Sequence, residues 1–96
     1  MIYLVSRHQG AVAWCQHQGI VVDSILPHID ISIIRMGDVV IGTLPINLAA
    51  EIQRLGGRYI HLSLDVPFEW RGVELTSEQL NEIGASLQEF RIEKMS

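Results

Sequence analysis

The chain has 96 residues, of which 48% are hydrophobic, and a formal net charge of −4 at pH 7. This length predicts one domain, residues 1–96, that buries only roughly 60–65% of the surface its unfolded chain exposes. The negative charge argues against a broad basic face for long nucleic acid, but it permits a local pocket for a small anion. No apolar run reaches the length of a membrane span and nothing resembles a signal peptide, so we expect a cytoplasmic protein without membrane contact.

Apolar runs and amphipathic segments alternate over the first third of the chain. Residues 2–6 form a short apolar run that predicts a buried parallel strand. Residues 11–18 predict a two-turn helix, for which Gly19 provides the C-cap. Residues 20–26 predict a second strand, and the stretch after Asp30 has room for only a single helical turn.

The alternation continues to the C-terminal part of the chain. Residues 38–44 predict a third strand, and the helix predicted over residues 45–55 carries an apolar stripe at i, i+4 and i+7. Apolar and polar side chains alternate over residues 58–66, which predicts a fourth strand with one core face and one polar face. A capping box opens the last helix, predicted over residues 76–90, although Gly84 weakens it.

Together these elements predict an α/β fold: a small Rossmann-like domain of three layers, with a mostly parallel sheet of four or five strands. Right-handed crossovers favour the strand order 2-1-3-4, which places the ends of the first and third strands side by side. Ligands of open α/β sheets bind in the crevice at such a switch point. We therefore expect residues 6–8 and 42–45 to face one cavity, with Ser63 and Asp65 beside it.

The helix predicted from Pro45 lacks a capping side chain, because Leu44 stands at the N-cap position. The amides of Ile46, Asn47 and Leu48 then point, with the positive end of the helix dipole, at a group that the local sequence does not supply. Either water or an anion fills that place. The position of this helix start at a switch point favours an anionic ligand.

Small and polar residues before this helix would suit such a ligand. Gly42 would let it approach the backbone, Thr43 adds a hydroxyl donor, and Asn47 an amide able to read a base or a sugar. Gly42 could equally mark a bulge or a close packing contact in its strand. The sequence has no P-loop lysine and no G-x-G-x-x-G motif, so neither an ordinary NTPase nor a dinucleotide-binding domain is supported.

Arg7 and His8 reach one site only if the chain turns after Ser6, since neighbours in an extended segment point to opposite sides. In that case Arg7 would hold a phosphate through two hydrogen bonds, and His8 would act as a general acid or base near neutral pH. The structural alternative is that Arg7 pairs with Asp65 at a strand end and that His8 is merely solvated.

Other chemically able residues give weaker signals. His61 is expected to be satisfied by its neighbours on the fourth strand, and Trp14 to lie in the core. Trp70 stands beside Arg71 in a loop, where it could stack on an adenine or cover a dimer edge. No metal centre is expected, because the histidines and the single Cys15 share no ligand spacing such as His-x-x-x-His or Cys-x-x-Cys.

Three stretches of the chain resemble a known family. They read VSRHQGAVAW at 5–14, GDVVIGTLPINLAAEI at 37–52 and RYIHLSLDVP at 58–67, and RGVELTSEQL follows. In this order they are similar to the small CRISPR-associated accessory family numbered sixteen in the Csx series. The resemblance implies a ring nuclease of type III CRISPR defence that linearises a cyclic oligoadenylate, with cyclic tetra-adenylate the expected substrate. It also implies a homodimer, which the high hydrophobic content independently favours, and no metal or other cofactor.

Without a metal, the ribose 2′-hydroxyl attacks the adjacent phosphate and leaves a 2′,3′-cyclic phosphate. On this reading the expected catalytic residues are Arg7, His8 and Asp65. Arg7 would stabilise the phosphorane, His8 would move a proton, and Asp65 would orient one of the two. The expected ligand-binding residues are Ser6, Gly42, Thr43, Leu44, Pro45, Asn47, Ser63 and Arg71. A module that binds the messenger without cutting it, and a structural subunit of an effector complex, are the alternatives.

Overall fold

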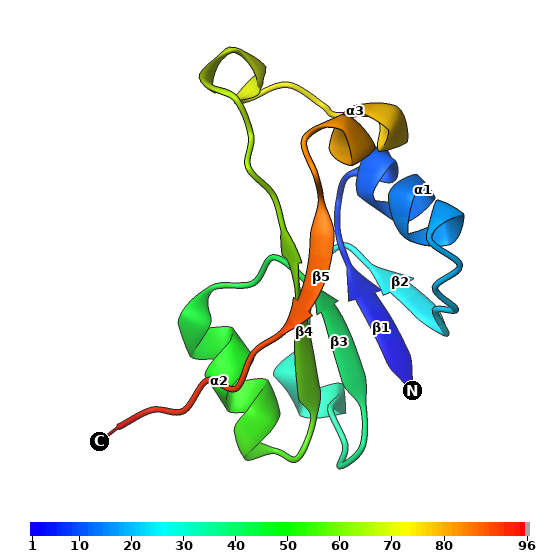
Figure 1. Cartoon of the computed structure of the whole chain (residues 1–96). Coiled ribbons are helices and arrows are strands. Elements are labelled where there is room, and N and C mark those ends of the chain that lie inside the picture. Colours follow the sequence, from blue (N-terminus) through cyan, green and yellow to red (C-terminus); the bar gives the residue numbers. More distant parts are fainter. Residues whose placement is uncertain (96) are drawn as a thin grey trace.

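A single five-stranded sheet forms the centre of the molecule (Figure 1). In the computed structural model, which describes residues 1–95, the strands are β1 (Ile2–Val5), β2 (Ser24–Leu26), β3 (Val39–Gly42), β4 (Arg58–Ser63) and β5 (Ser86–Glu89). The helices are α1 (Gln9–His17), α2 (Ile46–Arg54) and α3 (Ser77–Glu82), with 3₁₀ turns η1 (Ile31–Ile33) and η2 (Phe68–Trp70). The strand order is β2-β1-β3-β4-β5, and all pairs are parallel except β4 and β5. The predicted order of the first four strands and the α/β class are confirmed.

Helices cover both faces of the sheet, which gives three layers. One core joins α1 and α3 to one face and has as its buried members Leu4, Ala11, Trp14, Cys15, Ile41, Leu62 and Leu80. The second core joins α2 and the η1 region to the other face through Tyr3, Val5, Ile34, Val40 and Ile52. Figure 1 shows α1 and α3 together on one side of the sheet and α2 on the other. Within residues 1–95, no helix has both the length and the apolar character that a membrane span requires.

The face of β4 predicted to be polar is in fact part of the interior. Tyr59 belongs to it and is only 1% exposed, because α2 packs over this side of the strand. The apolar side chain of Leu64, assigned to the core face, lies beyond the end of β4 and is 38% exposed. The alternation of apolar and polar side chains predicted the strand correctly. It could not show that a second helix layer covers the face with the polar side chains.

The last predicted helix, residues 76–90, is wrong in its second half. The capping box between Thr76 and Gln79 is present as predicted, but α3 ends at Glu82. Gly84 adopts φ +73°, and the N–H of Ala85 donates to the carbonyl of Leu80 at 3.0 Å, which closes the helix. The chain then reverses into β5, which pairs antiparallel with β4.

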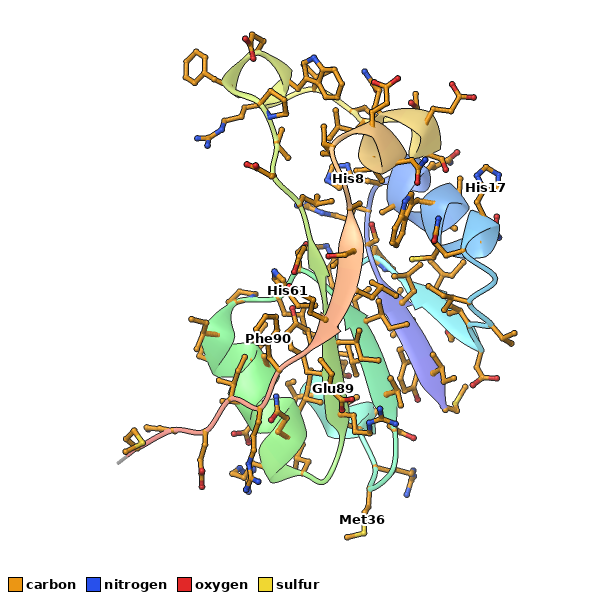
Figure 2. All side chains as sticks on the ribbon, in the orientation of Figure 1. His8, His17, Met36, His61, Glu89 and Phe90 are labelled. Carbon is orange, nitrogen blue, oxygen red and sulfur yellow. The ribbon has the colours of Figure 1, made fainter. Side chains whose placement is uncertain are left out.

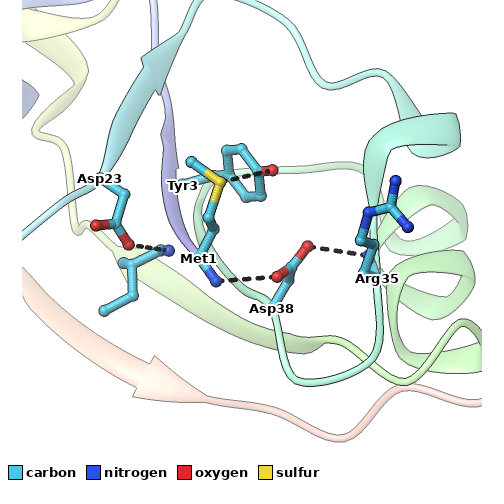
Figure 3. A network of polar contacts seen from close by, with 6 residues as sticks. Met1, Tyr3, Asp23, Arg35 and Asp38 are labelled. Carbon is cyan, nitrogen blue, oxygen red and sulfur yellow. Dashed lines mark hydrogen bonds and ion pairs between the residues drawn. The ribbon is translucent and has the colours of Figure 1, made fainter.

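A network of polar contacts joins the amino ends of β1 and β3, opposite the expected site (Figure 3). The buried carboxylate of Asp38 accepts hydrogen bonds from the Arg35 N–H at 2.9 Å and from the Met1 ammonium group at 3.0 Å. These donors hold the pKa of Asp38 below its usual range, the Arg35 amide contributing most. Asp38 therefore fixes where both strands begin, and so the register that brings their other ends together.

Candidate functional site

The carboxyl ends of β1 and β3 lie side by side, with Val5 opposite Gly42. Segments that follow β1, β2 and β3 line a cleft here of about 370 Å³. We call it the switch-point cleft; its lining residues are Val5, Ser6, Arg7, His8, Pro27, His28, Ile29, Thr43, Leu44, Pro45 and Leu48. The volume lies at the lower end of the range for small-molecule sites.

The chain turns after Ser6. This turn was the condition for bringing Arg7 and His8 to one site. The Ser6 Oγ accepts the His8 N–H at 3.1 Å, and both Arg7 and His8 then line the switch-point cleft. Both side chains are exposed. In the described part of the chain Arg7 forms no ion pair, so the expected structural alternative, a pair with Asp65, is absent from residues 1–95.

The start of α2 presents fewer free amides than predicted. Pro45 is the N-cap, so the prediction of Leu44 at that position is wrong by one residue, and Pro45 provides no side-chain hydrogen bond. Its carbonyl accepts the N–H of Leu48 at 3.1 Å, so the prediction that the Leu48 amide is unpaired is wrong. A tight 3₁₀-type bond of this kind is one of the usual ways to satisfy a helix end. For the amides of Ile46 and Asn47, no acceptor lies within residues 1–95.

A buried tyrosine satisfies a backbone amide just before α2. The Leu44 N–H donates to the Tyr59 Oη at 2.8 Å, and that oxygen also lies 3.0 Å from the Gly42 carbonyl and 2.7 Å from the His61 Nδ1. Burial raises the pKa of Tyr59, so the phenol keeps its proton. Tyr59 therefore holds the turn that carries Thr43 into the cleft.

Gly42 serves close packing of the two strands. A Cβ atom at this position would lie 2.8 Å from the carbonyl oxygen of Val5. Any larger residue would push β1 and β3 apart where their ends form the cleft. Of the two explanations that the sequence left open, the structure favours the packing contact over direct approach of a ligand.

An apolar slot of about 140 Å³ adjoins the cleft on the α1 and α3 side of the sheet. Ser6, His8 and Thr43 line both cavities, so polar groups stand at the boundary between them. The rest of the slot is mainly aliphatic, from Leu4, Val5, Ala11, Leu62, Leu64, Val73, Leu75 and Leu80. Such a surface can hold the flat face of a base while the polar boundary meets sugar or phosphate.

Four expected site residues lie outside both cavities. Asp65 and Arg71 line a separate open hollow with Trp70. The Ser63 hydroxyl donates to the Gln88 side chain at 2.8 Å, across the β4–β5 pair. Asn47 lines a groove between α2 and the C-terminal segment. The structure therefore brings together the residues after β1 and β3, and leaves those of the fourth strand and the following loop apart.

Two cleft neighbours were not predicted. His28 lines the switch-point cleft because it follows β2, the strand next to β1. Applying the rule of strand ends to β2 would have found it. Glu74 approaches His8 with 3.3 Å between Oε2 and Nδ1. The two residues stand 66 positions apart, and no periodicity or motif in the sequence joins them.

The remaining polar and aromatic residues have structural surroundings. Trp14 and Cys15 lie in the core as predicted, and burial raises the pKa of the Cys15 thiol. His61 contacts the Tyr59 hydroxyl, and its ring meets that of Phe90 edge to face (Figure 2). In residues 1–95, no three His, Cys, Asp or Glu side chains cluster closely enough to hold a metal ion.

Comparison with models of protein families gives a match over nearly the whole chain. Residues 3–93 match the model of a family described as "Putative CRISPR-associated protein (Cas_VVA1548)". No curated protein and no solved structure matches the chain.

Proposed function

Because the chain belongs to the Cas_VVA1548 family of CRISPR-associated proteins, we propose that it is a metal-independent ring nuclease. Its substrate would be a cyclic oligoadenylate, and cyclic tetra-adenylate is the first candidate. The resemblance of three stretches of the sequence to the Csx accessory family supports this activity. The family match itself extends only to an association with CRISPR.

The observation that carries the proposal is the meeting of Arg7 and His8 at one cleft. Arg7 has a guanidinium group without a carboxylate partner in residues 1–95, which leaves it able to bind a phosphate through two hydrogen bonds. His8 lies beside it with an imidazole that can accept or give a proton. Thr43 adds a hydroxyl donor from the other strand end.

These groups fit the chemistry of phosphodiester cleavage without a metal. The ribose 2′-hydroxyl would attack the adjacent phosphorus, the bond to the 5′-oxygen would break, and a 2′,3′-cyclic phosphate would remain. Arg7 and Thr43 would stabilise the additional negative charge of the phosphorane. His8 would take the 2′ proton or give one to the leaving 5′-oxygen, for a gain of about 10²–10⁴-fold.

The proposal includes a homodimer. A cleft of about 370 Å³ accommodates part of a cyclic tetranucleotide, and a two-fold axis would let two copies of the same cleft use equivalent parts of one ring. Asp65 remains a proposed catalytic residue and Arg71 a proposed ligand contact, at the edge of the neighbouring hollow where a larger ligand would extend. The other proposed ligand contacts are Ser63, Asn47, Gly42, Leu44 and Pro45. Of these, Gly42 also packs against Val5.

Variants of the two cleft residues test the proposal. In single-turnover reactions with enzyme in excess and EDTA present, Arg7→Ala and His8→Ala should each slow cleavage of cyclic tetra-adenylate by about 10²-fold or more. Arg35→Ala and His17→Ala are matched controls, because they remove the same side chains at sites away from the cleft. If both cleft variants fold and cleave at the wild-type rate, the site assignment is wrong.

The same reactions separate a nuclease from a module that only binds. A binding module would retain the ring intact even when protein exceeds ligand. A structural subunit would show neither cleavage nor an increase in thermal stability on adding the ring, since a ligand of the folded state must raise stability.

A further inference from the structure

Within residues 1–95, Glu74 is the side chain that forms a hydrogen bond with the imidazole of His8. Its Oε2 lies 3.3 Å from Nδ1, and both side chains are more than half exposed, 65% for His8 and 61% for Glu74. Exposed ion pairs of this kind add little to folding stability. What the contact does to the histidine is a separate question.

A carboxylate selects one tautomer of the neutral imidazole. Ionised Glu74 can only accept a hydrogen bond, so the Nδ1 of His8 carries the proton in this contact. The Nε2 is then the nitrogen without a proton, free to accept one from a substrate hydroxyl. The same hydrogen bond restricts rotation of the ring and stabilises the imidazolium that forms when Nε2 takes up a proton.

Backbone contacts next to each partner help to place it. His8 is the N-cap of α1; its N–H donates to Ser6 Oγ at 3.1 Å and its carbonyl accepts from Ala11 at 3.2 Å. Glu74 precedes Leu75, whose carbonyl oxygen would lie 1.7 Å from a Cβ atom at Gly10. The absence of a side chain at Gly10 thus lets the Glu74 segment pack directly on the first turn of α1.

From this geometry we infer that Glu74 is a positioning residue, which holds His8 with Nδ1 protonated and Nε2 facing the reacting atoms. The inference rests on the proposed nuclease function and names a further residue for it. Arg7 and His28 line the same cleft as His8 and are the other charged or titratable groups that face it there. Arg7 has no acceptor atom, and within residues 1–95 His28 makes no hydrogen bond to the His8 ring, so Glu74 is the group placed to set the tautomer.

Variants at Glu74 and nitrogen NMR test the inference. Nδ1 and Nε2 shifts of His8, measured above the pH at which its ring becomes neutral, should show mainly the Nδ1–H tautomer in the wild type and a mixture in Glu74→Ala. In single-turnover reactions, Glu74→Ala should slow cleavage of cyclic tetra-adenylate about 10-fold or more, while its Kd for the ring changes less than twofold. Glu74→Gln keeps an oxygen acceptor and should recover part of the rate.

Glu69→Gln is the matched control, because it removes one negative charge from an exposed position of the same segment. It should leave both tautomer and rate unchanged. A wild-type protein that cleaves nothing overturns the nuclease function and this inference together. Two other results are decisive when the wild type does cleave the ring: Glu74→Ala cleaves it at a rate within twofold of the wild type, or both proteins have the same His8 tautomer. Either result overturns the role of Glu74 and leaves the nuclease function standing.

Discussion

Tyr59 is the residue on which the shape of the cleft depends most directly. Its hydroxyl accepts the Leu44 N–H and reaches the Gly42 carbonyl, so it holds both sides of the turn at Thr43. The sequence pattern placed Tyr59 on a polar face, and no local signal relates it to a loop 15 residues away in the chain. Contacts of this kind depend on the third layer, which periodicity within one strand does not reveal.

Removing this hydroxyl should loosen the turn. Tyr59→Phe leaves the Leu44 amide without its acceptor in a largely buried place, which should lower the free energy of unfolding by about 1–3 kcal/mol. Chemical denaturation measures the change. Tyr3→Phe is the matched control, because the Tyr3 hydroxyl contacts only the Met1 sulfur at 3.4 Å among the described residues. Equal effects of the two substitutions would contradict the role given to Tyr59.

Asp38 gives stability that depends on pH. Its pKa is lowered in the folded protein, so its contribution is complete above the unfolded value of about 3.9 and is lost as pH falls through the folded pKa. Asp38→Asn should therefore lower the free energy of unfolding by about 1–3 kcal/mol above pH 5. The difference from the wild type should shrink below about pH 4.

Denaturation at a series of pH values measures this difference. Glu82→Gln provides the control, because it removes a charge at an exposed position and should behave as the wild type at every pH. A difference between wild type and Asp38→Asn that stays constant down to pH 2 would show that the charge of Asp38 is not what matters.

At the scale of elements, the parallel strands and their order follow from the sequence, whereas the end of the last helix does not. Apolar runs at residues 2–6 and 38–44 predict buried strands, and right-handed crossovers then leave few possible orders. Leu80, Ile83 and Leu87 fit a helical stripe, but Leu87 reaches the same core from β5. Gly84 decides between helix and strand for Leu87, because its left-handed conformation ends the helix. The hydrophobic pattern does not encode that conformation.

Substitution at Gly84 tests this account of the helix end. Nothing lies within 4 Å of a Cβ atom there, so the cost of a side chain is conformational. With φ at +73°, Gly84→Ala should destabilise the fold by about 1–2 kcal/mol, and Gly84→Asn by less, because asparagine tolerates this region better. Thermal denaturation compares them. An alanine variant as stable as the wild type would mean that α3 can continue past Glu82.

The predicted strand order places part of the site correctly. It correctly predicted that the segments after β1 and β3 meet, and the cleft there contains Arg7, His8 and Thr43. It did not predict that Glu74 approaches His8, because a loop of irregular structure makes that contact. The loop packs on α1 through one close contact, between Leu75 and Gly10. A single contact of this kind produces no periodic pattern in the sequence.

At the scale of the whole molecule, apolar side chains remain on the surface of a small acidic chain. Several large hydrophobic residues are more than half exposed, among them Val21, Met36, Ile46, Phe68 and Val73. Two of the five, Phe68 and Val73, belong to the segment beside the apolar slot and the open hollow. A second subunit or a large ligand at these places would agree with the proposed homodimer on a cyclic nucleotide.

The proposed function requires that the cleft after β1 and β3 cuts a cyclic oligoadenylate without a metal. The most direct measurement is mass spectrometry of cyclic tetra-adenylate incubated with excess protein in EDTA. Our account predicts linear products that end in a 2′,3′-cyclic phosphate, and their loss in Arg7→Ala and His8→Ala. Recovery of the intact ring from the wild-type protein, whether free or bound, would contradict it.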